Sequence, residues 1–414
     1  MDNNLLQPLK GFRDFLPEDA KKRSFAIDNI KSTFELYGFE PLETPALEYE
    51  SLLLGKYGDE ADKLIYRFED EGGRRVALRY DQTVPTARIL ASYKQQLPMP
   101  WKRYQIQPVW RAEKPQRGRF REFFQCDADI YGTTSPLADA EIVALANALF
   151  QNLGFRDFKI YINDRNILFD VIGFVKIPPE LQFSVIASID KLDRKSEEEV
   201  ASELIAKGID TNTVKHLFEH LKTVKPTQKL QEVLDLSQNL GVNKERLFFE
   251  PRLARGLDYY TSTIFEVKID DYPAGSVLGG GRYDNLIDTL CSVDIPAVGF
   301  ALGFDRTIEA LDMFGLFPKE KTYTKVLVSV FNKDLADEAA MVAANLRGNG
   351  IETEIFPSYE VKLEKQLKYA DKKQIPWLVV VGPEEVNKNK VVLKNLNTGK
   401  QTEEKLSDLP EKIS

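Results

Sequence analysis

The spacing of apolar residues predicts a helix near the start of the chain and an extended segment after it. Between residues 26 and 37, apolar side chains recur every three or four positions, which is typical of a helix packed on one side. We expect this helix to begin near Pro17 and to stop at Gly38. Residues 39–47 form an extended pattern broken by two prolines, which indicates a strand at a sheet edge or an interface.

Alternating and continuous apolar runs then predict two groups of strands joined by short turns. Such turns are typical of an antiparallel sheet, and helices are expected between some of the strands, near residues 85–94 and 137–153. The predicted strands are residues 64–68, 75–80, 101–111, 121–131, 247–249, 262–269, 276–281 and 298–302, and a helix over 305–313 follows the last of them.

The pattern of apolar and charged residues changes at two points along the chain, and these changes predict its domains. Residues 166–242 consist of charged helical patterns, so we interpret them as a helical insertion between residues 1–165 and 243–318 of one α+β domain with a mainly antiparallel sheet. After a polar linker, strands and helices alternate through residues 325–414. This alternation predicts a separate C-terminal α/β domain.

Composition excludes a membrane-spanning chain. No apolar run approaches the roughly 20 residues that cross a bilayer, and residues 1–10 lack a signal core, so a cytoplasmic location is expected. Only two cysteines are present, Cys126 and Cys291, both in apolar or strand-like surroundings. We expect two reduced thiols, although one disulfide is possible.

The distribution of charge points to a phosphate site within an acidic protein. The net charge is −8, but residues 101–121 contain seven basic residues and a single acidic one, Glu113. Such a strip is suited to phosphates, although charge alone is equally consistent with a solvated basic face.

Several familiar catalytic patterns are absent from the sequence. It has no P-loop, no strand-linked GxGxxG and no nucleophile elbow. His216 and His220 are its only histidines, and both lie in the predicted insertion. Their spacing would suit a metal on a helix face, but no thiolate or carboxylate pattern accompanies them, so a solvated helical pair is the better interpretation and no metal site is expected.

Arginines within sheet-like sequence are the strongest chemical signal. Each stands in an apolar or aromatic context, where a buried cation is costly unless it pairs with an anion. An internal salt bridge with Asp127, Asp129 or Asp258 would account for any one of them. Arginines that converge on one sheet are instead suited to binding a triphosphate without a P-loop. They are Arg111, Arg121, Arg255 and Arg306.

Acidic, amide and hydroxyl groups form a second set. Residues 125, 127 and 129 would point to one face of a strand, because side chains alternate along it. Ordinary strand polarity is the alternative, but the set could also hold an ammonium and a second polar group, as in a zwitterion beside a nucleotide. Its members are Asp81, Thr83, Gln125, Asp127, Asp129, Tyr259 and Tyr260.

These residues stand in motifs that resemble the class II aminoacyl-tRNA synthetases. Residues 110–123 (WRAEKPQRGRFREF) resemble motif 2, and their continuation at 124–132 (FQCDADIYG) has the form found in the histidine enzymes. Residues 303–306 (GFDR) resemble motif 3, and residues 38–45 resemble motif 1 with its dimer-interface proline. Residues 253–261 (LARGLDYYT) and 279–284 (GGGRYD) resemble signatures of the histidyl-tRNA synthetase family. The resemblance covers nearly the whole chain, and the insertion matches by position only.

The resemblance implies roles for individual residues. Arg111 would contact the ATP α-phosphate and the histidine carboxylate, Arg255 would approach the same phosphate, and Arg306 would hold the γ-phosphate; these three would be catalytic. Glu113, Arg119 and Arg121 would hold adenine and the tRNA end. Asp81, Thr83 and Gln125 would bind the substrate ammonium. Asp129 and Tyr260 would read the imidazole nitrogens, and Tyr259 would line the same pocket.

The resemblance also implies a reaction and its partners. L-Histidine would be activated by ATP to histidyl-adenylate with release of pyrophosphate, and then transferred to the 3′ end of tRNA(His) with release of AMP. Mg²⁺ would accompany ATP, and the enzyme would be a homodimer without membrane attachment. The C-terminal domain would bind the anticodon with a lysine-rich helix near residues 359–373, and the insertion would clamp the acceptor stem.

Two other functions are consistent with parts of the pattern. A non-catalytic, histidine-binding regulatory subunit of ATP phosphoribosyltransferase resembles these enzymes, but it lacks the C-terminal domain and a preserved 253–261 stretch. A class II synthetase for proline or threonine is the second alternative, against which the 253–261 stretch argues. One departure is Asp81 in an RYDQT setting, where many bacterial members carry glutamate; we expect no loss of binding.

Overall fold

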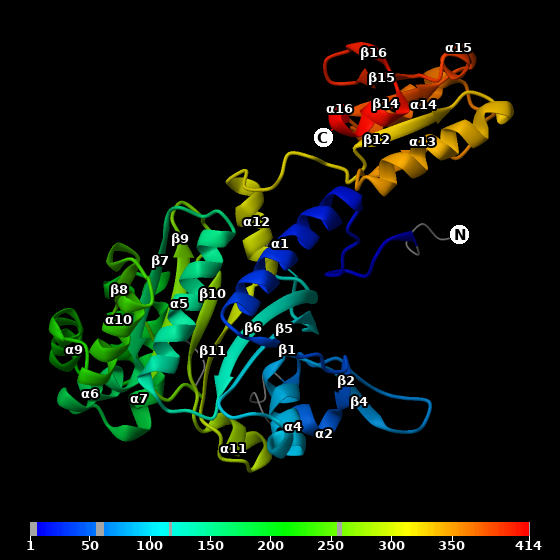
Figure 1. The fold of residues 1–414 in the computed structure, drawn as a ribbon. Helices are drawn as coiled ribbons and strands as arrows, with labels where there is room; N and C mark the ends of the chain where they lie inside the picture. Colours follow the sequence, from blue (N-terminus) through cyan, green and yellow to red (C-terminus); the bar gives the residue numbers. More distant parts are fainter. Residues whose placement is uncertain (1–5, 55–61, 116–117, 255–258, 414) are drawn as a thin grey trace. The chain divides into compact units, whose positions relative to one another are not determined.

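The structure is a computed structural model that describes residues 6–54, 62–115, 118–254 and 259–413 (Figure 1). The chain divides into two compact units. The large unit comprises residues 1–14 and 24–316, and the small unit comprises residues 15–23 and 317–414.

An eight-stranded sheet forms the centre of the large unit. The neighbouring strands are antiparallel, except at the two edges, where β1 pairs with β5 and β8 pairs with β7 in parallel. This arrangement confirms the predicted fold class. In spatial order the strands are β1 (Glu40–Pro41), β5 (Trp101–Trp110), β6 (Glu122–Tyr131), β11 (Ala297–Gly303), β10 (Leu278–Arg282), β9 (Thr263–Ile269), β7 (Phe158–Asp164) and β8 (Leu247–Phe249).

Helices α1 (Pro17–Leu36) and α5 (Pro136–Asn152) pack on one face of this sheet (Figure 1). The ring of Phe34 lies 5.5 Å from that of Tyr104 on β5 and 5.9 Å from that of Phe300 on β11, measured between centroids. Helix α5 begins as the sequence predicts, because Ser135 caps it and Pro136 occupies its first turn. The helices therefore bury one face of the sheet and leave the other for the site.

A smaller antiparallel sheet packs beside the open face. Strands 64–68 and 75–80 were predicted among the sheet strands; in the structure they form a separate sheet with a third strand, in the order β2 (Leu47–Tyr49), β4 (Arg75–Leu78) and β3 (Arg67–Glu69). Its buried residues pack with those of α2 (Glu50–Leu53), α4 (Thr83–Tyr93) and α11 (Leu286–Cys291).

Only helices lie between β7 and β8. The first of them, α6, starts at the residue after β7 ends, so its beginning is fixed to the central sheet. A capping box of Ser196 and Glu199 begins α8. The helices are α6 (Arg165–Phe174), α7 (Pro179–Ile189), α8 (Glu197–Ala206), α9 (Thr211–Thr223) and α10 (Gln228–Asn239), and the short turn η3 (Asp190–Asp193) follows α7.

The small unit is an α/β domain, as predicted. Its sheet has the order β13 (Thr353–Ile355), β12 (Val326–Val330), β14 (Trp377–Val381), β15 (Val391–Asn395) and β16 (Gln401–Glu404), and its first three strands are parallel. Helix α13 (Ala336–Gly348) and helix α14 (Leu363–Lys373) contribute to two separate apolar clusters on this sheet. In neither unit does the described part of the chain contain a helix long and apolar enough to cross a membrane.

Candidate active site

The open face of the central sheet is hollow because its middle strands carry almost no side chains there. Residues directly opposite each other in antiparallel strands share a face. Gly299, Ala301 and Gly303 of β11 therefore lie on the face of Asp129, Asp127 and Gln125 of β6, their partners in the ladder. We call Gln125, Asp127 and Asp129 the polar row. It flanks a floor of backbone continued by Gly279 and Gly281 of β10.

Two of these glycines are required by close approaches. A Cβ atom on Gly299 would lie 1.9 Å from Oδ1 of Asp129, and one on Gly281 would lie 2.8 Å from Cδ1 of Tyr260. No side chain can occupy either position without displacing these two neighbours. The missing side chains thus allow a carboxylate and a phenol to lie directly on the sheet.

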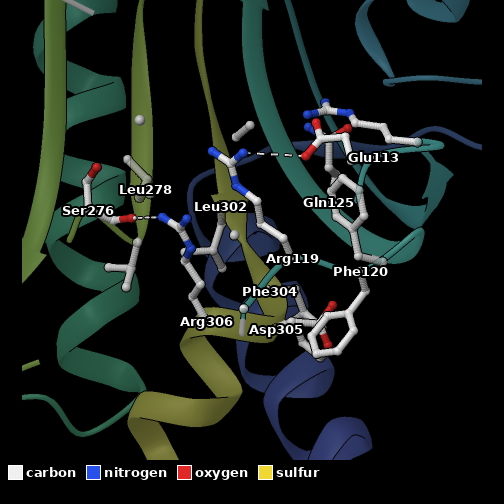
Figure 2. Close-up of a pocket in the computed structure, with 17 residues that line it drawn as sticks. Glu113, Arg119, Phe120, Gln125, Ser276, Leu278, Leu302, Phe304, Asp305 and Arg306 are labelled. Atoms are coloured by element: carbon white, nitrogen blue, oxygen red, sulfur yellow. Dashed lines mark hydrogen bonds and ion pairs between the residues drawn. The ribbon is translucent and has the colours of Figure 1, made fainter. Parts of the chain in front are cut away.

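A cavity of about 460 Å³ opens at one end of this floor (Figure 2). Its walls come from the connection between β5 and β6, from the start of β10, and from the junction of β11 with α12 (Phe304–Met313). The lining residues are Arg111, Glu113, Gly118, Arg119, Phe120, Phe123, Gln125, Ser276, Val277, Leu278, Gly279, Ala301, Leu302, Gly303, Phe304, Asp305 and Arg306.

Two arginines in this cavity have no carboxylate partner among the described residues. Nε of Arg111 donates to the carbonyl of Tyr80 at 3.1 Å, and its guanidinium lies over the rings of Tyr80 and Phe123. Nη1 of Arg306 donates to the carbonyl of Ser276 at 2.9 Å. Burial, followed by the like charge of Arg119, lowers the pKa of Arg306. A half-buried cation beside another cation is stabilised by an anion, which is what a phosphate supplies.

The remaining charges of the cavity are partly neutralised. Arg119 lies 3.5 Å from the carboxylate of Glu113, and Figure 2 shows the two reaching toward each other. Asp305 is paired with Arg13 at 2.8 Å, and the guanidinium of Arg13 also lies over the ring of Phe120. The cavity is therefore left with an excess of positive charge from Arg111 and Arg306.

Arg121 lies in a different environment from the other arginines named from the sequence. Its Nε donates to the carbonyl of Glu113 at 3.1 Å, and its Nη1 donates to the carbonyl of Lys10 at 3.3 Å. It is not among the residues that line the cavity. Its observed contacts tie the connection between β5 and β6 to the N-terminal segment.

At the far end of the polar row, Asp129 is part of a buried cluster. Its Oδ2 lies 2.8 Å from Nη2 of Arg103, and its Oδ1 accepts a hydrogen bond from the hydroxyl of Tyr283. Burial raises the pKa of Asp129, while Arg103 opposes this rise. In the sequence, Arg103 is only one member of the basic strip and Tyr283 does not stand out, so neither residue was predicted to belong to the site.

The start of α4 approaches the polar row from the side of the smaller sheet. Oδ1 of Asp81 accepts a hydrogen bond from the backbone of Val84 at 3.2 Å, and Thr83 is the first residue of the helix. Between them, Nε2 of Gln82 donates to the carbonyls of Gln107 and Gln125 at 3.0 and 3.1 Å. These bonds fasten the segment of Asp81 and Thr83 to the strands β5 and β6.

Two tyrosines cover the glycine floor. The rings of Tyr259 and Tyr260 lie 4.7 Å apart, and that of Tyr259 lies 5.8 Å from the ring of Tyr283. Arg255, expected from the sequence to be catalytic, lies outside the described residues. Of the residues named from the sequence, the structure thus gathers Arg111, Glu113, Arg119, Gln125 and Arg306 in one cavity, with Asp129 and the tyrosines on the adjoining floor.

Asn163 and Arg165, where β7 joins α6, donate hydrogen bonds to residues on both sides of residue 255. Nδ2 of Asn163 donates to the carbonyls of Pro251 and Leu253 at 3.1 and 2.9 Å. Nη1 of Arg165 donates to the carbonyl of Tyr260 at 3.3 Å. No local pattern in the sequence signals this arrangement, because it depends on the pairing of β7 with β8 and with β9.

Comparison with known proteins gives one consistent family. A family model described as "Histidyl-tRNA synthetase" matches residues 11–307, and one described as "Anticodon binding domain" matches residues 325–414. The histidine–tRNA ligase of Cytophaga hutchinsonii is 40% identical, over 95% of this chain and 96% of that protein. The histidyl-tRNA synthetase structure from Nostoc sp. PCC 7120 has a TM-score of 0.87 at 30% identity, covering 98% of each chain.

A further solved structure shares the fold alone. It is described as an ATP phosphoribosyltransferase regulatory subunit/histidyl-tRNA synthetase from Bacillus halodurans C, and it has a TM-score of 0.76 at 21% identity. It covers 91% of this chain and 98% of its own. The fold by itself therefore does not separate a ligase from a regulatory subunit.

Proposed function

Because the chain belongs to the histidyl-tRNA synthetase family, we propose that its cavity holds ATP and that the polar row holds histidine beside it. The chain is a histidine–tRNA ligase, related over nearly its full length to curated members. The observation that carries the assignment of the two subsites is the excess of positive charge at Arg111 and Arg306, next to a polar row rich in acceptors.

In the activation step the histidine carboxylate attacks the α-phosphorus of ATP, and pyrophosphate leaves. Negative charge spreads over phosphate oxygens in this step, so fixed cations stabilise the transition state without reorganising. Arg111 would serve the α-phosphate and the attacking carboxylate, since its guanidinium is oriented by the Tyr80 carbonyl and two rings. Arg306, oriented by the Ser276 carbonyl, would serve the γ-phosphate. Glu113 and Arg119 would frame the adenine.

Histidine recognition would rest on the residues around the floor. The carboxylate of Asp129 is kept in place by Arg103 and Tyr283, so it can accept a hydrogen bond from one imidazole N–H. Tyr260, lying on Gly281, would meet the other nitrogen, and Tyr259 would close the pocket. Amino acids without two ring nitrogens would leave these buried groups unpaired, which can discriminate by several powers of ten.

Magnesium would enter with the nucleotide. Phosphate oxygens and water usually supply most of the ligands of Mg²⁺ in nucleotide sites, where the ion neutralises phosphate charge. The described residues contain no group of three or more His, Cys, Asp or Glu side chains that could hold a metal. We expect ATP to bring the ion to the site.

The small unit would bind the anticodon through its lysine-rich helix. Lys365 and Lys372 of α14 are exposed and form no ion pair with the described residues, whereas Lys368 is paired with Glu364. Charge reversal at residues 365 and 372 should weaken tRNA charging and reduce its salt dependence, because phosphate contacts release counterions. The same change at residue 368 serves as the control. Since tRNA is its substrate, we place the enzyme in the cytoplasm.

The homodimer would form around the segment that resembles motif 1. Leu36, Leu47 and Tyr49 are large apolar residues with exposed fractions of 76%, 43% and 61%, and they flank the edge strand β1. Apolar side chains gathered on a surface mark interfaces. Sedimentation of Leu36→Glu should show a shift toward monomer, and an unchanged dimer would contradict this surface.

The test of the proposed function is ATP–pyrophosphate exchange with each amino acid in turn. Exchange that depends on histidine alone, and that collapses when Arg111 is changed to Gln, would support both subsites. Tight histidine binding without exchange would instead favour the regulatory-subunit alternative. Exchange with proline or threonine would favour a class II synthetase for that amino acid.

Charging of tRNA(His) by a variant without residues 166–242 tests the role of the insertion. A clamp on the acceptor stem predicts that charging falls more than exchange.

A further inference from the structure

The N-terminal segment of residues 10–13 belongs to the large unit and runs along the connection between β5 and β6. The backbone N–H of Arg121 donates to the carbonyl of Gly11 at 2.9 Å, and Nη1 of Arg121 donates to that of Lys10 at 3.3 Å. A Cβ atom on Gly11 would lie 2.8 Å from Cγ of Arg121 and 2.9 Å from Cγ of Pro115. The segment therefore lies against the connection at a distance that only glycine allows.

Arg13, the last residue of this segment, contacts two walls of the cavity at once. Its Nη2 donates to Oδ1 of Asp305 in the first turn of α12, at 2.8 Å. Its guanidinium lies over the ring of Phe120 in the connection between β5 and β6, 3.2 Å from the ring centroid. Figure 2 shows Phe120 and Asp305 next to each other at the edge of the cavity. One side chain thus joins the connection to the start of α12.

The two walls joined in this way also carry groups proposed to bind ATP. Arg306 is the residue after Asp305, and Arg119 is the residue before Phe120. The connection also reaches Arg306 itself, because a Cβ atom on Gly118 would lie 3.9 Å from its Nε. The position of the connection relative to α12 therefore sets the width of the proposed nucleotide cavity.

The ion pair of Arg13 also affects the charge of the cavity. Asp305 lines the cavity and its side chain is 10% exposed, so a carboxylate lies beside the place proposed for phosphates. Without a compensating cation it would repel the phosphates and compete with them for Arg306. Arg13 is not among the residues that line the cavity, so it compensates this charge from behind the wall.

We propose that Arg13 is a positioning residue of the nucleotide site. It holds the connection between β5 and β6 against α12, and it neutralises Asp305 so that the cavity accepts a triphosphate. This inference rests on the proposed function, which places ATP in the cavity. Arg13 acts through Phe120 and Asp305 and touches neither substrate. The N-terminal segment is then a working part of the ATP site.

Calorimetric titration of the full chain with ATP and Mg²⁺, without histidine, tests the assignment. In Arg13→Met, we expect ATP to bind about 3- to 30-fold more weakly, the range for a lost cation–ring contact at a partly buried site. Arg13→Lys keeps a positive charge beside both partners and should recover part of the affinity. Histidine should bind both variants within about twofold of wild type, because Phe120 and Asp305 lie at the end proposed for ATP.

A double variant tests whether Arg13 acts through Asp305. Arg13→Met combined with Asp305→Asn should bind ATP more tightly than Arg13→Met alone, because no carboxylate is left to repel the phosphates. A double variant that binds ATP no better than Arg13→Met would overturn the neutralising role of Arg13.

The matched control is Arg88→Met. Nη2 of Arg88 lies 2.8 Å from the carboxylate of Glu48, and this arginine is 30% exposed, against 27% for Arg13. Neither residue of the control pair is among those that line the cavity, so the ATP affinity should stay near that of wild type. Unchanged ATP affinity in Arg13→Met, or equal weakening of ATP and histidine, overturns the proposal. Wild-type protein that binds no ATP would defeat the proposed function instead, before any variant is compared.

Thermal melting guards against a folding defect. Because both arginines are partly exposed, Arg13→Met should melt close to Arg88→Met. Pyrophosphate exchange adds a kinetic readout, in which Arg13→Met should raise KM for ATP more than it lowers kcat. If Arg13→Met melts well below the control, or if Arg13→Lys loses as much ATP affinity as Arg13→Met, the role of Arg13 is structural and the proposal fails.

Discussion

The guanidinium of Arg103 lies 2.8 Å from the carboxylate of Asp129, and the two side chains are 1% and 7% exposed. They face each other directly across β5 and β6. Burial raises the pKa of Asp129 and favours its neutral form, and the pairing with Arg103 opposes this rise beneath the proposed histidine pocket. In the proposed site Arg103 would therefore act on the substrate through Asp129 rather than by touching it.

Changing Arg103 to Met should destabilise the large unit strongly. It leaves Asp129 as a buried carboxylate without its cation, a loss that typically costs about 3–5 kcal/mol. Urea unfolding followed by tryptophan fluorescence measures the change. Arg74→Met breaks a pair of similar length, 2.7 Å, but this arginine is 63% exposed, so the control should change stability little. Similar losses in both variants would contradict a special role for burial.

Adding one methyl group at Gly299 should harm histidine binding and stability together. The new Cβ would meet Oδ1 of Asp129 at 1.9 Å, so the carboxylate or the strand must shift, with a cost of about 1–3 kcal/mol. Differential scanning calorimetry and histidine titration measure the two effects. Gly173→Ala in α6 meets nothing within 4 Å and should be neutral or stabilising. A normal histidine affinity in Gly299→Ala would show that Asp129 can move freely.

Changing Arg306 to Gln should impair the use of ATP specifically. Removing one fixed donor from a developing charge typically lowers the rate about 10²- to 10³-fold. Pyrophosphate exchange should show this loss in kcat/KM for ATP, with little change in the affinity for histidine. Arg306→Lys should recover part of the activity, since lysine restores the positive charge but not the planar set of N–H donors of a guanidinium. A selective loss of histidine affinity would mean that Arg306 contacts histidine rather than ATP, and would contradict the prediction.

Asn163 should influence activation without contacting either substrate. Its amide holds the carbonyls of Pro251 and Leu253, so Asn163→Ala releases one end of the stretch that leads to Tyr259. We expect kcat for exchange to fall while KM for ATP stays near that of wild type. Asn29→Ala is a control, because its amide bonds only to Phe25 in the previous turn of α1. Equal effects in both variants would exclude a positioning role.

The raised pKa of Asp127 predicts how pH affects stability. A carboxyl whose pKa is higher in the folded than in the unfolded state contributes stability at low pH, and this is lost as pH rises through the folded pKa. The groups around it are Arg103, Arg111, Asp81 and Asp129.

From about pH 4, where a free aspartate titrates, the wild type should lose stability relative to Asp127→Asn as pH rises. Melting curves of both proteins over a range of pH measure this difference. Parallel curves at all pH values would mean that Asp127 does not titrate in this range.

The sequence predicts the main elements well where one pattern dominates. Helix α1 begins at the predicted Pro17, and β5, β6 and α5 lie within a residue or two of their predicted bounds. Strand β7 was missed, because its apolar residues alternate with lysine, tyrosine and asparagine and end directly at a helix. The separation of β2, β3 and β4 into their own sheet was also not predictable, since strand pairing at a distance leaves no local signal.

The residues of the candidate site also divide into those that stand out in the sequence and those that only the strand pairing reveals. Arg111, Arg306 and Gln125 stand out in the sequence because polar groups interrupt apolar strands, and all three line the cavity. Arg103 is an ordinary member of a basic strip until the register places it against Asp129. Arg121 is the opposite of Arg103: it is prominent in the sequence, but its described contacts are with backbone carbonyls.

The grip of Asn163 on residues 251 and 253 also bears on the order in which the chain folds. Residues 251 and 253 follow β8, which pairs with β7 although about eighty residues, including the whole helical segment, lie between these two strands. Closing so long a loop is slow, and Asn163 has no carbonyls to hold until it has closed. Pro251 and Leu253 should therefore be among the last residues to reach their native contacts. A newly made chain would then become active only once this edge of its central sheet has formed.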